Sequence, residues 1–489
     1  MTKTRYFGTD GIRGRVGKSP LVPEFVLKLG YAAGKVLGNA AKTHPTFVVG
    51  RDTRQSGQML QSALTAGMLS SGATVIDLGV ITTPGVAFLA RKLNVDAGVV
   101  LSASHNPVDE NGIKFFNPKG MKLSESVELA IESLIDTEMD LGNMSAADFG
   151  RSIDGTDMRE LYVDDLVDEH NSPILSGLKL VLDCANGAAS WYAPEVFSRL
   201  GAAVVTINAS PTGMNINDMA GSEHVRSYPA NIAALIRQYD ANFGITFDGD
   251  ADRVIFVDEN GNLVDGDHML AILANYLQAQ GLLTANTVVS TNMANGSLNH
   301  YFTKRGIQFI ETPVGDKYVM EKLVGLQDHT AQPHSFGLGG EQSGHIIIMD
   351  KTHRTGDGIR SALFLIKAFL ESGSETLSSL ANSINKYPQL IASCYVESKP
   401  DISQIQAIND LKTKMQENLP GLVRMNLRYS GTEPKFRLML EADTRHQMAE
   451  LAAYAWQVCE TIQRETQTPA GAPIEVLNVT SGGLLSKAL

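Results

Sequence analysis

The residues best suited to chemistry lie in a short polar segment that follows an apolar run. Residues 96–107 read DAGVVLSASHNP, and the run is followed by Ser102, Ser104, His105 and Asn106. Because Pro107 disfavours continuation of a strand, these side chains are expected on a turn at the strand's carboxyl end. Open α/β sheets place their chemistry there. The segment suits a nucleophile or a phosphoryl carrier, although serine and asparagine also favour ordinary turns.

A second candidate site is DGDADR, residues 248–253, which again follows an apolar run. Asp248, Asp250 and Asp252 alternate there, and carboxylates at this density repel one another unless a hard cation neutralises them. Oxygen ligands of this kind suit Mg²⁺ or Mn²⁺. An EF-hand is not predicted, because Arg253 stands where that calcium loop needs glycine. The alternative, an acidic surface turn, leaves the adjoining apolar run unexplained.

A third segment, GGEQSGH at residues 339–345, carries Glu341, Ser343 and His345 on alternate positions. Side chains two residues apart point the same way along an extended segment, so these three are predicted to line one wall. A carboxylate, a hydroxyl and an imidazole can hydrogen-bond several hydroxyl or amine groups of a polyol. The alternative is a glycine-rich turn with a solvated histidine.

A fourth segment, RYSGTEPKFR at residues 428–437, suits an anion. The side chains and backbone groups that could hold it come from Arg428, Ser430, Gly431, Thr432, Lys435 and Arg437. Turn N–H groups, two hydroxyls and flanking guanidiniums are what a phosphate monoester requires. Near the N-terminus, GTDGIRGR adds Asp10 and Arg13, which is either a flexible loop or a further oxyanion contact.

One mechanism uses all of these segments. Ser104 would carry a phosphoryl group, the three aspartates would hold a divalent cation beside it, and the other loops would bind a sugar and a phosphate. The cation and the guanidiniums would stabilise charge on the transferring group. A general acid or base must also act on the sugar hydroxyl. The sequence does not rank the candidates, which are Lys114, His105, His345 and Arg13.

The elements that position these residues follow a repeated pattern of strand, helix, strand and polar loop. Counting six residues from Gly98, Gly244 and Gly337 leads to Ser104, Asp250 and Ser343. Such self-similarity indicates three copies of one α/β unit with largely parallel sheets. After about residue 388 the pattern changes, with strands predicted at 423–427 and 436–440. Residues 468–489 lack a clear period and are expected to form a poorly ordered tail.

Composition limits the class of protein. A chain of 489 residues is too long for one core, so three or four domains are expected. The net charge of −12 argues against nucleic acid as the main partner. No run approaches the roughly 20 apolar residues of a membrane span, and no secretory signal is recognised. Three separated cysteines, Cys184, Cys394 and Cys459, fit a reducing compartment, so a cytoplasmic location is predicted.

Five motifs in order, TDGIRG, SASHNP followed by NGIK, DGDADR, GEQSGH and RYSGTEP, resemble those of the alpha-D-phosphohexomutase superfamily over nearly the whole chain. The resemblance implies three α/β domains with mixed, largely parallel sheets, a C-terminal α+β domain and an active site in a central cleft. The predicted domains are residues 1–155, 156–262, 263–380 and 381–489, the last with a flexible tail. It also implies a reaction through a bisphosphorylated sugar that turns around in the site.

The same resemblance implies roles for individual residues. Ser104 would be the phosphoserine and, with Asp248, Asp250 and Asp252, would hold one Mg²⁺. The catalytic candidates are Ser104, His105, Lys114, Arg13, Arg253 and His345. The substrate-binding candidates are Glu341, Ser343, His345, Arg428, Ser430, Gly431, Thr432 and Arg437. A sugar bisphosphate is expected as activator and intermediate, and a small-molecule sugar phosphate and a second copy of the chain are the expected partners.

Within the superfamily, RYFGTDGIRG, GGEQSGHII and TGDGI resemble the bacterial phosphoglucosamine mutases most closely. That subfamily interconverts glucosamine 6-phosphate and glucosamine 1-phosphate for cell-wall precursors. The phosphoglucomutases and phosphomannomutases are the alternative, and a non-catalytic sugar-phosphate-binding regulator is a third. The chain departs from the subfamily pattern at Ala251 and Lys435, and Lys435 leaves the sugar preference open.

Overall fold

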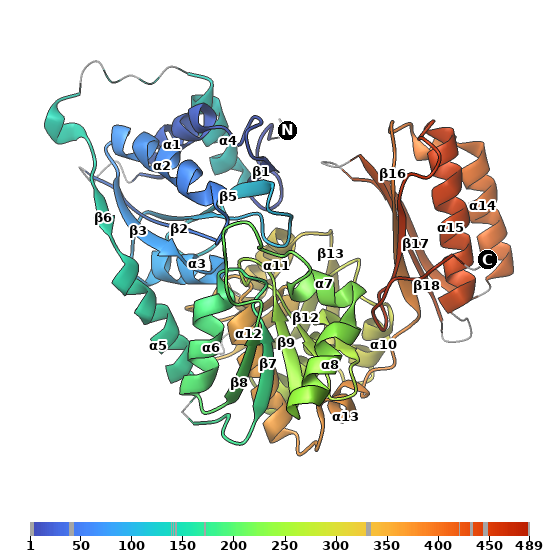
Figure 1. Cartoon of the computed structure of the whole chain (residues 1–489). Coiled ribbons are helices and arrows are strands. Elements are labelled where there is room, and N and C mark those ends of the chain that lie inside the picture. Colours follow the sequence, from blue (N-terminus) through green and yellow to red (C-terminus); the bar gives the residue numbers. More distant parts are fainter. Residues whose placement is uncertain are drawn as a thin grey trace.

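The computed structural model describes residues 4–38, 44–137, 139, 141, 144–170, 173–328, 334–419, 421–430, 434–443 and 448–487. Within them the chain forms four sheets, each built from one successive stretch of sequence (Figure 1). The first three sheets mix parallel and antiparallel pairs, as predicted, and the fourth is antiparallel. None of the helices in the described part combines the length and the apolar run that crossing a membrane takes.

The first sheet has six strands. Their order is β1 (Ile12–Arg15), β5 (Glu110–Phe116), β4 (Ala97–Leu101), β2 (Thr46–Arg51), β3 (Thr74–Val80) and β6 (Ser152–Asp154). Its helices are α1 (Pro23–Leu37), α2 (Ser56–Ser70), α3 (Thr83–Lys92) and α4 (Glu125–Ile135). Successive side chains of a strand face opposite ways, so Val48 packs with α3 whereas Phe47 and Val49 pack with α1 and α2. Burial on both faces explains the continuous apolar runs.

The second sheet has five strands, in the order β11 (Leu263–Val264), β10 (Val254–Val257), β9 (Phe243–Phe247), β7 (Lys179–Asp183) and β8 (Ala203–Ile207). Its helices are α5 (Glu160–Asp168), α6 (Ala189–Arg199), α7 (Gly221–Ser227) and α8 (Pro229–Tyr239). Because β11 pairs with β10, this sheet extends two residues beyond the boundary predicted at residue 262.

The third sheet has four strands, in the order β13 (Gln308–Thr312), β12 (Leu283–Thr291), β14 (Phe336–Gly340) and β15 (Ile346–Met349). Its helices are α9 (Gly266–Ala279), α10 (Ser297–Thr303), α11 (Asp316–Asp328), α12 (Gly358–Glu371) and α13 (Leu377–Ala381). One buried apolar cluster runs from α3 through α5 and α6 to α9 and α12. The first three domains therefore share a continuous core.

The predicted repeat is confirmed by the strand pairing. In each of the first three sheets an inner parallel strand turns back into an antiparallel neighbour: β4 into β5, β9 into β10, and β14 into β15. The three polar loops singled out in the sequence are the turns of these hairpins. They therefore occupy equivalent places, at the carboxyl ends of β4, β9 and β14.

The C-terminal sheet has the order β17 (Leu422–Tyr429), β18 (Lys435–Ala442), β16 (Gln389–Tyr395) and β19 (Ile474–Asn478), with α14 (Gln406–Asn418) and α15 (Met448–Glu465) on one face (Figure 1). The expectation of a poorly ordered tail is wrong for β19, which pairs with β16. Val476 is 1% exposed and fills the core of this domain. Three short 3-10 helices, η1 (Ala146–Asp148), η2 (Thr156–Arg159) and η3 (Ile402–Gln404), complete the elements.

A candidate active site where three sheets meet

The serine loop, residues 102–107, holds Ser104 in the left-handed backbone region, with a φ of 52°. The Ser104 N–H donates to Ser102 Oγ at 2.9 Å. The Ser104 carbonyl accepts from Arg54 Nη2 at 3.0 Å and from Asn217 Nδ2 at 2.8 Å. A non-glycine residue keeps such a conformation only where its surroundings fix it. Here they aim the Ser104 hydroxyl at Asp248, to which it donates a hydrogen bond.

The aspartate loop, residues 248–253, brings Asp248, Asp250 and Asp252 together, with carboxylate oxygens within 4.8 Å of one another. All three are at most 5% exposed. Burial, together with the charges of Asp252 and Asp250, holds the pKa of Asp248 well above its usual range. One buried oxygen each on Asp250 and Asp252 has no hydrogen-bond partner. An all-oxygen donor set with unsatisfied acceptors fits Mg²⁺, so these residues could hold the predicted cation.

Two other groups touch the aspartates directly. Thr83, at the start of α3, donates its hydroxyl to Asp250 Oδ2 at 2.5 Å. Lys114, on β5, places Nζ 2.9 Å from the same oxygen. Lys114 is 1% exposed, and a buried ammonium is stable only beside anions. The loop is therefore built as a balanced cluster of charges rather than as an acidic surface turn.

A closed ring of ion pairs, which we call the charge ring, surrounds this cluster. Its members alternate in sign and are Lys114, Asp10, Lys122, Asp316, His345 and Asp252. In that order the N to O distances are 3.0, 2.5, 2.6, 3.3 and 3.7 Å, and Asp252 closes the ring to Lys114 at 3.2 Å. Three members come from the first domain, one from the second and two from the third. The charge ring thus ties three domains together beside Ser104 and the three aspartates.

The charge ring fixes the protonation of its members. Burial works against a charged His345, yet Asp316 and Asp252 raise the pKa of this imidazole to about 10. Burial likewise opposes the Lys114 charge, but Asp10, Asp250 and Asp252 raise its pKa well above the usual range. Of the four candidates for proton transfer, Lys114 and His345 therefore carry their protons at neutral pH.

His105 behaves in the opposite way. Burial and the neighbouring Arg253 guanidinium lower its pKa to about 3. Arg253 Nη1 lies 2.9 Å from His105 Nδ1, so this nitrogen accepts the hydrogen bond and the ring is neutral. Arg253 also donates its backbone N–H to Asp248 Oδ1 at 3.1 Å. Arg13, the remaining candidate, bonds Asp10 and reaches Ala103 O at 3.5 Å, beside Ser104.

The glycine loop, residues 339–345, joins β14 to β15 through a tight turn, in which the Gly344 N–H donates to Glu341 O at 3.0 Å, rather than through the extended segment predicted. Glu341 and Ser343 are half-buried, whereas Gln342 and His345 are buried. Glu341 Oε1 accepts from the Gly315 N–H at 3.3 Å. Gly344 has a φ of 94°, and a Cβ there would lie 2.2 Å from Val254 O, so only glycine allows this turn against β10.

The arginine loop follows β17 and precedes β18. Arg428 and Arg437 are partners across these strands, and burial together with the Arg437 charge lowers the pKa of Arg428. Two arginines paired across neighbouring strands concentrate positive charge, which suits an anionic ligand. Ser430 donates its N–H to Lys435 O at 2.8 Å, and its own carbonyl accepts from Lys399 Nζ at 2.6 Å. Gly431 and Thr432 lie outside the described residues.

The structure thus brings Ser104, Asp248, Asp250, Asp252, Arg253, His105, Lys114, Arg13 and His345 into one site, with Glu341 and Ser343 on the adjoining loop. The predicted phosphate residues Arg428, Ser430 and Arg437 belong to the C-terminal domain, which stands to one side of the other three (Figure 1). Sequence reasoning missed Arg54, Asn217, Lys122 and Asp316. Arg54 lies on the polar turn between β2 and α2, and this position was the only feature of the sequence that could have indicated a role for it.

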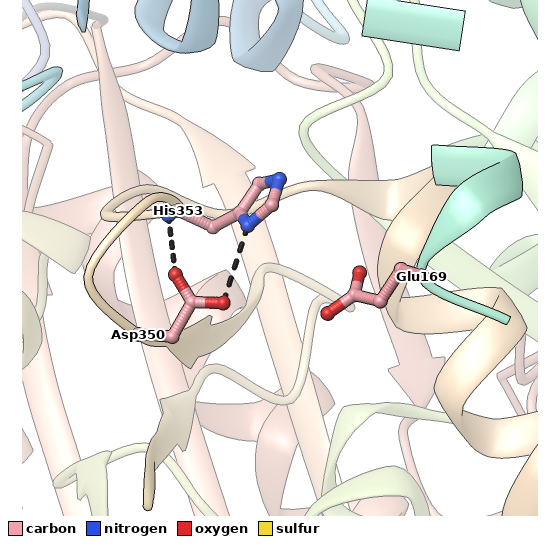
Figure 2. Close-up of side chains that lie close together, drawn as sticks. All are labelled: Glu169, Asp350 and His353. Carbon is pink, nitrogen blue, oxygen red and sulfur yellow. Dashed lines mark hydrogen bonds and ion pairs between the residues drawn. The ribbon is translucent and has the colours of Figure 1, made fainter. Parts of the chain in front are cut away.

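A second polar cluster, of Glu169, Asp350 and His353, lies apart from this site (Figure 2). Arg360 donates to Glu169 Oε2 at 2.7 Å and to Asp350 Oδ2 at 2.8 Å. His353 contacts Asp350 and stacks on Phe88 of the first domain, with ring centroids 5.7 Å apart. A guanidinium already balances both carboxylates, so this cluster ties the domains together and offers a cation no advantage.

Family models for the phosphoglucomutase/phosphomannomutase group match four parts of the chain in order. They are the alpha/beta/alpha domain I at residues 4–141, domain II at 160–261, domain III at 265–387 and the C-terminal domain at 391–456. A protein named phosphoglucosamine mutase from Geobacillus kaustophilus is 43% identical over 462 residues, 94% of this chain and 99% of that one. The Anoxybacillus flavithermus protein of the same name is 45% identical over 444 residues, 90% and 95% of the two chains.

Solved structures agree in fold. A phosphoglucomutase/phosphomannomutase family protein from Burkholderia thailandensis matches with a TM-score of 0.71 and 24% identity, covering 96% of this chain and 99% of that one. The Aspergillus fumigatus N-acetylphosphoglucosamine mutase, solved with GlcNAc-6P and magnesium, matches with a TM-score of 0.62 and 17% identity, covering 95% and 96%. At these identities the likeness concerns the four-domain architecture.

Proposed function

The chain belongs to the alpha-D-phosphohexomutase superfamily, and from that membership we propose that it interconverts glucosamine 6-phosphate and glucosamine 1-phosphate. It is an isomerase that acts by phosphotransfer, and the proposed reaction supplies amino-sugar nucleotides and cell-wall precursors. Relatives named phosphoglucosamine mutase, identical at 43% to 45% of positions, support the amino sugar over glucose or mannose phosphates. The observation that carries the chemistry is the buried hydrogen bond from Ser104 to Asp248, inside a triad of aspartates.

In the proposed mechanism a sugar hydroxyl oxygen attacks phosphorus on phospho-Ser104. The new oxygen–phosphorus bond forms as the bond to Ser104 Oγ breaks, which gives a bisphosphorylated sugar and a free serine hydroxyl. After the sugar turns around, Ser104 attacks the other phosphate and the enzyme is restored. Arg54 and Asn217 hold the Ser104 backbone, so the hydroxyl stays at one place for both half-reactions.

Asp248, Asp250 and Asp252, with Ser104, would hold Mg²⁺, which neutralises charge on the transferring phosphoryl oxygens when bound. Lys114, beside Asp250, and Arg13, at the Ala103 carbonyl next to Ser104, would add positive charge near the transferring phosphoryl group. The proton lost by the sugar hydroxyl must finally reach Ser104 Oγ, so no net proton is consumed. Lys114 and His345 carry exchangeable protons beside Asp252 and are the groups placed to pass it on.

Sugar and distal phosphate would be held by different domains. Glu341, Ser343 and His345 offer acceptors and donors to the sugar, and the Glu341 carboxylate can pair with a protonated 2-amino group. Arg428, Ser430 and Arg437, with Gly431 and Thr432, would hold the phosphate that is not transferred. A sugar bisphosphate would load Ser104 at the start. The homodimer and the cytoplasmic location stay predictions.

Initial rates test the substrate. With Mg²⁺ and a trace of the matching sugar bisphosphate, the specificity constants for glucosamine 1-phosphate, glucose 1-phosphate and mannose 1-phosphate are compared. We expect glucosamine 1-phosphate to lead by at least about tenfold, since a charge-assisted hydrogen bond is worth about 1.5 to 3 kcal/mol. Equal or higher values for glucose or mannose phosphate would keep the mechanism and contradict the amino-sugar assignment. No turnover of any of the three, with binding intact, would favour the non-catalytic regulator.

A further inference from the structure

Gln342 is a buried polar side chain of the glycine loop, and its partners lie outside the candidate sugar site. It lies between Glu341 and Ser343, yet it is 5% exposed. Its Nε2 donates to Asp267 Oδ2 and to Gln389 Oε1, both at 2.8 Å. Asp267 belongs to α9, whereas Gln389 is the first residue of β16 in the C-terminal domain. The glycine loop is therefore bonded to a different domain through the residue between Glu341 and Ser343, its candidate sugar-binding side chains.

Gln389 carries the connection into the C-terminal sheet. This residue is 0% exposed, and its Nε2 donates to Glu441 Oε2 at 2.9 Å. Glu441, also 0% exposed, lies opposite Gln389 on β18. The Glu441 carboxylate accepts from Arg424 Nε at 3.1 Å and from the Gly296 N–H at 3.0 Å. Gly296 precedes α10, so the third domain also contacts the fourth directly at this carboxylate.

Arg424 and Glu441 lie on the two strands that end at the arginine loop. Four residues after Arg424, β17 presents Arg428, and β18 presents its partner Arg437. Paired strands move together, since sliding one past the other would break their backbone hydrogen bonds. The Glu441–Arg424 pair, which also contacts the third domain at the Asn292 and Ala294 carbonyls, therefore links the position of the candidate phosphate-binding arginines to that domain.

The hydrogen-bond partners fix the orientation of the two glutamine side-chain amides. An ionised carboxylate only accepts hydrogen bonds, so the NH₂ group of Gln342 must face Asp267 and that of Gln389 must face Glu441. The Gln389 carbonyl oxygen is then free to accept from Gln342, as observed. Buried Lys386 also contacts Asp265 at 2.5 Å and Asp267 at 3.1 Å, in the segment that leads to β16. Asp267, Gln342, Lys386, Gln389 and Glu441 are all buried in this junction.

We propose that Gln342, Gln389 and Glu441 form a positioning relay that sets the spacing between the sugar-binding loop and the distal phosphate site. The proposal rests on the proposed function, because it assumes that one ligand spans both. A hexose monophosphate must bind the glycine loop and the arginine loop at once. If the glycine loop and the arginine loop already have the spacing that the ligand needs, binding does not have to order them, and the affinity for the ligand is higher.

The test uses Gln342→Met, Gln389→Met and the double variant, all in the full chain. Methionine keeps the length and removes the amide. Gln61→Met, at a buried glutamine of α2 in the first domain, is the matched control. We expect KM for the hexose monophosphate to rise about tenfold in each single variant with kcat changed less than about threefold. The double variant should be no worse than the poorer single one, because both break one connection.

Amide hydrogen exchange of the substrate-free protein gives a second readout that needs no turnover. In Gln342→Met, exchange should accelerate about tenfold at Gly296 and across β16 and β18, while the first sheet is unchanged. Two results would overturn the relay: faster exchange confined to residues 339–345, or increases in KM that multiply in the double variant. If the native protein turns over no hexose phosphate, the proposed function fails, and the exchange comparison still decides whether the relay exists.

Discussion

At the scale of single residues, reactivity here depends on which charges face one another. Ser104 donates a hydrogen bond to the Asp248 carboxyl group. Burial and two neighbouring aspartates raise the pKa of this group well above its usual range. His345 and Lys114 each face two or three carboxylates and keep their protons. His105 faces a guanidinium and loses its proton. Residues of the same type therefore enter the site in different protonation states, set by their neighbours.

The aspartate triad predicts the effect of Asp250→Asn. The variant removes one carboxylate of the proposed Mg²⁺ site and a partner of Lys114 and Thr83. We expect Mg²⁺ affinity to fall at least about tenfold and the Mg²⁺ requirement for turnover to rise in parallel. Calorimetric titration and rates across Mg²⁺ concentrations check this. An unchanged Mg²⁺ dependence would show that the cation binds elsewhere.

His345 predicts how stability varies with pH. Its pKa is 6.5 when unperturbed and about 10 in the fold. A raised pKa stabilises the fold fully below about pH 6.5, and this contribution is lost as pH rises toward 10. Urea unfolding with EDTA should therefore show a loss of stability from pH 7 to 10 in the native protein that is smaller in His345→Gln. His300→Gln, at an exposed histidine of α10, should match the native protein. Equal losses in the native protein and His345→Gln would contradict the charge ring.

At the scale of elements, the strands that lead into the polar loops were predictable because each apolar run stops at a glycine- or proline-bearing turn, whereas the antiparallel return strands β5, β10 and β15 were not predicted. The strand runs and the six-residue spacing in three repeats located Ser104, Asp250 and Ser343. Strand β19 was hidden, since Pro469, Gly471 and Pro473 precede it and only five residues alternate. Local composition there favoured disorder, and pairing with β16 overrode it.

The burial of Val476 in edge strand β19 predicts how much shortening this side chain lowers the stability of the fold. Val476→Ala should lower the free energy of unfolding by about 2 kcal/mol, because the cavity lies in the core under α15. Leu477→Ala, one residue along on the other face of the strand, should cost less than half as much. Denaturant unfolding followed by tryptophan fluorescence checks both, since Trp456 packs against the same core. Equal costs would show that β19 does not bury Val476.

At the scale of the whole molecule, the site exists only where domains meet. Lys122 and Asp316 are 194 residues apart in sequence. Lys114 of the first domain pairs with Asp10 of the same domain and with Asp252 of the second. No local pattern marks such partners, because each is an ordinary charged residue until the domains pack. The residue types of the site could therefore be predicted from motifs, whereas the charge ring and the junction at Gln389 required the assembled fold.

Lys122→Met tests this coupling. The change leaves the partly exposed carboxylates of Asp10 and Asp316 without a largely buried cation, so we expect a loss of stability below the about 3 to 5 kcal/mol typical of a fully buried pair. We expect a lower melting temperature and a fall in kcat/KM of at least about tenfold, since Asp316 also orients His345. Lys119→Met, at an exposed lysine nearby, is the control and should behave as the native protein. A stable, fully active Lys122→Met would contradict a structural role for the ring.

The most direct test follows the phosphoryl group itself. The protein is incubated with Mg²⁺ and glucosamine 1,6-bisphosphate, and mass spectrometry locates the phosphate before and after a chase with glucosamine 6-phosphate. We predict phosphate on Ser104 alone, its loss to the sugar during the chase, and neither labelling nor measurable turnover in Ser104→Ala, a fall of at least about 1,000-fold. Phosphate on another residue, or phospho-Ser104 that persists through the chase while turnover continues, would contradict phosphotransfer through Ser104.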